Sequence, residues 1–237
     1  MAKQAHATGL LLPSREALLW ADGDLALLIE AARHAEKSGF DSVWAGDSLL
    51  ARPRGEPITL LAGVAGATTR VALGTAVLLP LLRNPLSLAH SLATLDRISK
   101  GRVIVGIGPG AELPGTHAEL KALGVPSDRR VSAMVGAVER VRHLWRNEEA
   151  GIELQPRPFR PGGPPIWVGG TGPRMLRLTG ESFDGWLPLS PTPADYVSGL
   201  RTVREAAERA GRDPDSIVTG VYLTVGVADT ARVSRGS

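Results

Sequence analysis

Short apolar runs alternate along this chain with segments in which apolar residues recur at helical spacing. The runs predicted to be strands are residues 9–13, 40–45, 71–79, 102–108, 166–169, 184–187 and 217–227. About six helices are predicted between them, with starts at Asp24, Pro57, Asn84, Ser127, Pro173 and Pro193. Residues 155–165 hold five prolines, which lack the backbone donor of regular structure, so this stretch is predicted to be a loop.

Repeated strand–helix units predict an α/β fold with a parallel sheet and right-handed crossovers. Two architectures fit this order: an open doubly wound sheet, or a (β/α)8 barrel of the TIM type. Seven strand signals leave a barrel one strand short, and periodicity does not choose between the two. The 237 residues show no change of composition along the chain, so residues 1–237 are predicted to form a single domain.

In both architectures the ligand site lies beyond the carboxyl ends of the strands. The glycine-rich segment Gly169–Pro173 follows a predicted strand and leads into a helix that starts at Pro173. Its backbone amides would then face one concavity at the positive end of a helix dipole, which favours a phosphate-binding turn. The alternative is a tight turn that merely needs glycine geometry.

Two other strand ends carry candidate chemistry. Asp47 follows the second strand, where it could bind a polar edge of a cofactor, act as an acid or base, cap a helix, or pair with Arg52 or Arg54. Residues 106–110 read GIGPG, which departs from the GxGxxG dinucleotide fingerprint in spacing and in its place at the fourth strand. Glycines there would instead let a flat ring lie against the backbone.

Composition narrows the classes of partner and compartment. The net charge is +3 and the basic residues are mostly scattered arginines, while aromatic residues are 4% of the chain, so we expect no nucleic-acid partner. There is no cysteine, no apolar run of membrane-spanning length and no signal-like segment among the residues given, so a cytoplasmic protein without a membrane partner is expected. The five histidines lack metal-ligand spacing, and no metal site is predicted.

Several stretches, taken together, resemble the bacterial luciferase-like family. They are GFDSVWAGDS at 39–48, the strand at 71–79 followed by Arg83-Asn84-Pro85, GRVIVGIGPG at 101–110, and PIWVGGTGPRMLRLTGESFDGW at 165–186. The resemblance covers nearly the whole chain, in order. It implies a TIM barrel and a flavin- or deazaflavin-dependent oxidoreductase or monooxygenase that acts on a small organic molecule, with either FMN or coenzyme F(420) as cofactor.

The resemblance also implies roles for individual residues around an isoalloxazine-type ring. Asp47 and Ser48 match the acidic and polar pair after the second strand, the candidate catalytic residues. The third-strand segment that backs the ring, often with a non-proline cis bulge, is matched by Gly74, Thr75 and Ala76. The remaining cofactor-binding candidates match the loop after strand four and the phosphate turn: Gly108, Pro109, Gly110, Glu112, Gly169, Gly170, Thr171, Gly172 and Pro173.

Two departures from the family pattern qualify this picture. Many deazaflavin-dependent members have His directly after the Asp, where this chain has Ser48. The family's eighth strand and closing helices have no counterpart after residue 227, so a shortened barrel, a fragment, or a barrel closed by a partner is expected. A flavin-binding protein without turnover is therefore the alternative to an enzyme. The two open sheet edges predict a homodimer or higher homo-oligomer, unless strands one and seven pair with each other.

Overall fold

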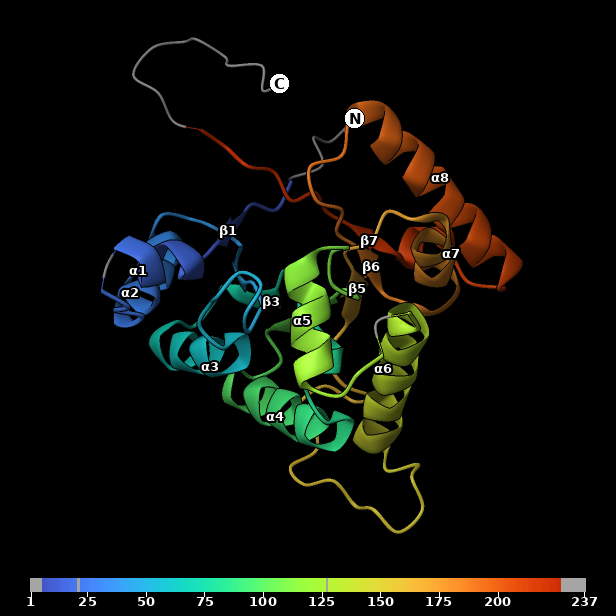
Figure 1. Ribbon diagram of the computed structural model, residues 1–237, viewed down its shortest axis with the longest axis horizontal. Coiled ribbons are helices and arrows are strands. Elements are labelled where there is room, and N and C mark those ends of the chain that lie inside the picture. Colours follow the sequence, from blue (N-terminus) through green and yellow to red (C-terminus); the bar gives the residue numbers. More distant parts are fainter. Residues whose placement is uncertain (1–5, 21, 127, 227–237) are drawn as a thin grey trace.

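The computed structural model describes residues 6–20, 22–126 and 128–226. Its seven strands are all parallel and follow one another in chain order. They are β1 (Gly9–Leu11), β2 (Ser42–Ala45), β3 (Ala72–Thr75), β4 (Val103–Ile107), β5 (Ile166–Val168), β6 (Gly185–Trp186) and β7 (Val218–Thr219). The sheet curls with helices on its outside, but β1 and β7 are not hydrogen-bonded neighbours (Figure 1). It is a TIM-type fold without a closed barrel, and the pairing of strands one and seven does not occur.

Helices connect successive strands and cover the outer face of the sheet. They are α1 (Ser14–Trp20), α2 (Ala26–Lys37), α3 (Pro57–Ala67), α4 (Pro85–Ile98), α5 (Pro114–Ala122), α6 (Arg130–Arg146), α7 (Pro173–Ser182) and α8 (Pro193–Arg209), with 3-10 turns η1 (Pro80–Leu82) and η2 (Pro214–Ser216). The starts expected at Pro57, Pro173 and Pro193 are confirmed, because each proline occupies the first helical turn. Asn84 caps α4 through a bond from the Leu86 amide.

The main core lies between the sheet and helices α2, α3, α4 and α6. Val43, Leu73 and Val103 are fully buried on successive strands, and Leu61 and Leu92 cover them from α3 and α4. A smaller cluster lies under α7 and α8, where Trp186 stacks on Tyr196 with ring centroids 5.2 Å apart. The two clusters together bury the outward side of the sheet on the first six strands.

Two indole rings fill the inside of the curled sheet. The centroids of Trp44 and Trp167 are 5.6 Å apart. A Cβ placed on Gly74 would lie 2.0 Å from the Trp44 ring, and one on Gly185 would lie 2.6 Å from the Trp167 ring. Glycine is therefore required at these two strand positions, because the large rings occupy the space that neighbouring side chains would need.

Several boundaries differ from the sequence-based prediction. The long third strand expected over 71–79 ends at Thr75, and only Leu78 returns to pair, as an isolated bridge with Ile107. The seventh strand is regular over two residues and continues irregularly, with a bridge between Leu189 and Tyr222. Helix α2 begins at Ala26 with Leu25 as its cap residue, although the Asp24 carboxylate accepts a bond from the Ala26 amide. Ser127 lies outside the described residues.

Candidate active site at the carboxyl ends of the strands

Small residues follow four neighbouring strands at the carboxyl edge of the sheet. Gly46, Ala76, Gly108 and Gly169 come directly after β2, β3, β4 and β5. A Cβ on Gly108 would lie 2.8 Å from the side chain of Val77, and one on Gly169 would lie 2.7 Å from it. The Val77 side chain therefore fills the space beside both glycines. The peptide bond between Ala76 and Val77 is cis, as the resemblance implied for this segment. The edge above the two tryptophans thus carries few side chains of its own.

Asp47 forms an ion pair with Arg83. Its two carboxylate oxygens accept bonds of 2.6 and 3.1 Å from the Arg83 guanidinium, and one of them also accepts the Leu79 amide at 2.9 Å. The Asp47 side chain is only 2% exposed. The sequence alternative in which Asp47 pairs with Arg52 or Arg54 is therefore wrong. Asp47 pairs with Arg83, which lies after β3 and 36 positions away in the sequence.

Glu56 extends this pair into a network. It accepts a 2.7 Å bond from Arg83 and also caps α3 by accepting the Thr59 amide. Burial alone would lower the pKa of Arg83, but the bonds to Asp47 and Glu56 raise it above its ordinary value. The network joins the end of β2 to the segment after β3 and to the start of α3.

Ser48 is held by a buried carboxylate that the sequence analysis missed. Its hydroxyl donates to Glu119 of α5 at 2.8 Å and accepts the Arg52 amide at 2.9 Å. Glu119 is 1% exposed and also accepts the amides of Leu50 and Ala51. Burial alone would raise the pKa of Glu119, but these bonds hold it below its ordinary value. Both polar residues after β2 are therefore satisfied within the protein.

Arg54 is a cation near the end of β2 that has no partner among the described residues. Its Nε, Cζ and Nη1 atoms all lie 3.1 Å from the position that a Cβ on Gly46 would occupy. The side chain is half-buried, and within residues 6–20, 22–126 and 128–226 its guanidinium makes no hydrogen bond or ion pair. The two nearest acidic residues in sequence, Asp47 and Glu56, both bind Arg83. Arg54 can thus meet an anionic or carbonyl group at the end of β2.

The turn after β5 has the geometry that its sequence predicted. Gly172 caps α7 and Pro173 occupies its first turn. Within the described part of the chain, the amides of Gly170, Thr171 and Gly172 donate no hydrogen bond, and Thr171, Gly172 and Pro173 are exposed. Amides without partners at the start of a helix are the arrangement that can bind an anion such as a phosphate.

Only part of the loop after β4 lies at this site. Gly108 donates its amide to Leu78, which joins the end of β4 to the segment after β3, and Pro109 follows it in the loop. Gly110 takes a positive φ of 83°, which favours glycine. Glu112, by contrast, is 64% exposed and pairs with Arg130 and His117. Its bond from Arg130 holds the pKa of Glu112 below its ordinary value.

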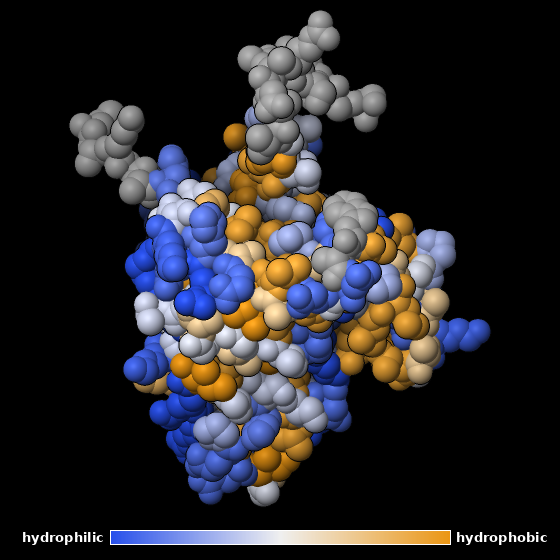
Figure 2. All heavy atoms as spheres, turned by 90° about the vertical axis from the view of Figure 1, so that its left-hand side faces the viewer, coloured by the Kyte–Doolittle hydropathy of each residue, from blue (hydrophilic) through white to orange (hydrophobic). Residues whose placement is uncertain are grey.

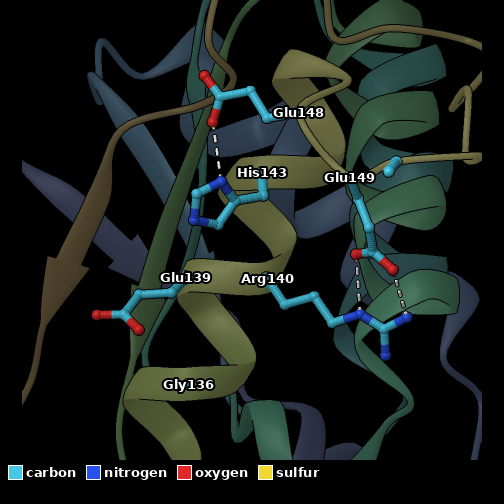
Figure 3. A pocket seen from close by; sticks show the side chains of 7 residues that line it. Gly136, Glu139, Arg140, His143, Glu148 and Glu149 are labelled. Atoms are coloured by element: carbon cyan, nitrogen blue, oxygen red, sulfur yellow. Dashed lines mark hydrogen bonds and ion pairs between the residues drawn. The ribbon is translucent and has the colours of Figure 1, made fainter.

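A surface pocket lies elsewhere, on α6 and the turn that follows it (Figure 3). His143 faces Glu148 there at 2.8 Å, and Arg140 forms two bonds with Glu149. Among the residues that the structure describes, no group of three or more acidic or histidine side chains could hold a metal ion. No helix in the same part of the chain is both long and apolar enough to cross a membrane.

A sequence profile of the family described as luciferase-like monooxygenase matches residues 7–235. The chain belongs to this family. Among its curated relatives, it is 30% identical over 213 residues to the 5,10-methylenetetrahydromethanopterin reductase of Methanolobus tindarius, with 87% of this chain and 63% of that protein covered. It is 36% identical over 222 residues to the phthiodiolone/phenolphthiodiolone dimycocerosates ketoreductase of Mycobacterium kansasii, with 78% and 59% covered.

The fold is shared with solved structures of other proteins. The monooxygenase RslO1 from Streptomyces bottropensis superposes with a TM-score of 0.76 at 27% identity, covering 90% of this chain and 70% of that one. This chain spans about three-fifths of the length of the curated relatives it matches.

Proposed function

We propose that this chain is a luciferase-like oxidoreductase that binds reduced FMN or coenzyme F(420) and acts on a small organic substrate. The observation that carries the proposal is the set of three free amides at Gly170–Gly172, beside a strand edge with few side chains, in a member of this family. The names of the relatives include reductases and a monooxygenase, so both hydride transfer and monooxygenation stay within the proposal.

The residues present fit such a cofactor. The amides of the turn at 169–173 would bind its phosphate at the start of α7. Gly74, Thr75 and Ala76 would back the ring, and Gly108 to Gly110 would let it approach the main chain. When bound, the cofactor supplies the hydride or the oxygen chemistry, and the protein supplies position and exclusion of water. Arg54 would place a positive charge beside the ring or the substrate.

Asp47 and Ser48 take a positioning role in this proposal. The Asp47 carboxylate is held by Arg83, and the Ser48 hydroxyl donates to Glu119. The Ser48 proton is engaged by Glu119 and the Asp47 charge is balanced by Arg83, so neither group is arranged as a free acid or base. They instead fix the loop that carries Arg54.

A flavin-binding protein without turnover is the second candidate. It is favoured by the gap between β1 and β7, which leaves one side of the sheet open. Steady-state turnover with reduced cofactor over a broad substrate panel separates the two. Tight cofactor binding with no turnover would support this candidate.

The proposed phosphate site can be tested by comparing FMN with riboflavin, which has the same ring but no phosphate. We expect the protein to bind FMN at least about tenfold more tightly than riboflavin, since charge-assisted bonds to amides contribute roughly 1.5–3 kcal/mol. Gly172→Val should remove this preference and leave riboflavin affinity unchanged. A Cβ on Gly172 meets no atom within 4 Å, so the variant should keep its fold.

Equal affinity for FMN and riboflavin in the unmodified protein would refute the assignment of the turn. A parallel titration with coenzyme F(420) then identifies the preferred cofactor.

We further propose that the protein is cytoplasmic and forms a homo-oligomer. The absence of cysteine suits a reducing compartment, and the open edges of the sheet support self-association.

A further inference from the structure

The chain after η2 forms the outer edge of the sheet. The amides of Val218, Gly220 and Tyr222 donate to the carbonyls of residues 184, 186 and 188, at 3.0, 2.9 and 3.0 Å. Even-numbered residues therefore bond towards β6. The amides of Val221, Leu223 and Val225 have no hydrogen-bond partner among the described residues. The odd-numbered positions thus present free donors on the opposite side, along the open edge.

This edge lacks the features that protect sheet edges from pairing. No charged residue occurs between Ile217 and Gly226, and proline is absent from the same stretch. Val218, Leu223 and Val225 are 50, 59 and 77% exposed. Figure 2 shows hydrophobic residues exposed on one face of the molecule. An exposed, uncharged strand of this kind favours pairing with another strand.

The edge at the other end of the sheet, formed by β1, differs from the edge at 218–226. In strand β1, Leu10 and Leu11 are half-buried, and Pro13 follows closely. A partly covered edge with a nearby proline is a poor template for pairing. The edge at 218–226 is therefore the one open to a partner.

The segment is complementary to itself when two copies run antiparallel about Tyr222. Val221 then faces Leu223 of the other copy, and Thr219 faces Val225, so β-branched and apolar residues meet on one side. The facing residues are odd-numbered, and these carry the free amides. We propose that residues 218–226 pair antiparallel with the same segment of a second copy, around a two-fold axis at Tyr222, and join two open sheets into one.

Sedimentation of the 237-residue chain tests the interface. We expect a concentration-dependent dimer whose dissociation constant rises roughly tenfold or more in Val221→Pro, because each copy loses one intermolecular bond. That amide has no hydrogen-bond partner among the described residues, so the variant should fold. The control Val221→Thr keeps the amide and the shape, and should retain the dimer. A monomer at all concentrations, or a dimer unaffected by the proline, would overturn the proposal.

A single cysteine tests the register, since the chain has none of its own. In Tyr222→Cys the two thiols would face each other across a non-bonded pair, with Cα atoms about 4.5 Å apart, and should oxidise to a disulfide-linked dimer. In Thr224→Cys they would be about 13 Å apart and should not cross-link. Cross-linking through residue 224 but not 222, or through neither in a folded dimer, would place the interface elsewhere.

Discussion

Two arginines near the end of β2 have opposite surroundings. Arg83 binds Asp47 and Glu56, whereas Arg54 lies over Gly46 with no partner among the described residues. A paired guanidinium in this setting stabilises the fold, whereas Arg54 is proposed to meet a ligand. Substitutions at the two sites should therefore separate stability from binding.

For the buried pair, we predict that Asp47→Asn lowers the free energy of unfolding by about 3 kcal/mol, because Arg83 loses its buried counter-ion and keeps only the more exposed Glu56. Urea denaturation measures this loss, with Glu30→Gln at the exposed pair to Arg33 as control. Unchanged stability together with lost cofactor affinity would instead make Asp47 a direct cofactor ligand.

For Arg54, we predict that Arg54→Met changes the free energy of unfolding by no more than about 0.5 kcal/mol, since no bond within the described protein is lost. Binding of reduced cofactor or of an anionic substrate should weaken. Calorimetry on the variant and on Arg83→Met compares the two. Loss of stability in Arg54→Met equal to that in Arg83→Met would show that Arg54 is a structural residue.

Helix α5 is hydrogen-bonded to the loop after β2 and fixes its position. Through Glu119 it holds Ser48, Leu50 and Ala51, and its carboxylate has a pKa below the ordinary value of 4.5. A group whose pKa is lower in the folded state stabilises the fold above its unfolded pKa. That stabilisation is lost as the pH falls below 4.5 towards the folded pKa.

We therefore predict that Glu119→Gln lowers the free energy of unfolding by about 1–2 kcal/mol at neutral pH. The difference from the unmodified protein should shrink as the pH falls below 4.5. Thermal unfolding over a pH series measures both effects. A difference that is independent of pH would mean that Glu119 acts through packing rather than through its charge.

The sequence predicted the alternation of strands and long helices well, because buried parallel strands and amphipathic helices have distinct periodicities. It missed α1 and α5, which are short and follow their strands within a few residues. It also missed the Asp47–Arg83 and Ser48–Glu119 contacts, which join residues 36 and 71 positions apart. Only the fold brings such residues together. The turn at 169–173 was predictable because its strand, glycines and helix start are contiguous.

At the scale of the molecule, the gap between β1 and β7 determines stability. An open sheet loses the inter-strand bonds and the burial that closure would supply, so self-association should contribute to the free energy of folding. We predict that the melting temperature rises with protein concentration, and that Val221→Pro removes this dependence. Calorimetry at several concentrations measures it. A melting temperature independent of concentration in both proteins would mean that the open sheet is stable as a monomer.

The two indoles inside the sheet have an optical consequence. Trp44 and Trp167 lie beneath the edge where the cofactor is proposed to bind, and they are two of five tryptophans in the chain. Their emission overlaps the near-ultraviolet absorption of flavins, so a bound ring should accept their excitation energy. Quenching of tryptophan fluorescence would then measure cofactor binding without an attached dye. Replacing both residues by phenylalanine would remove most of that quenching.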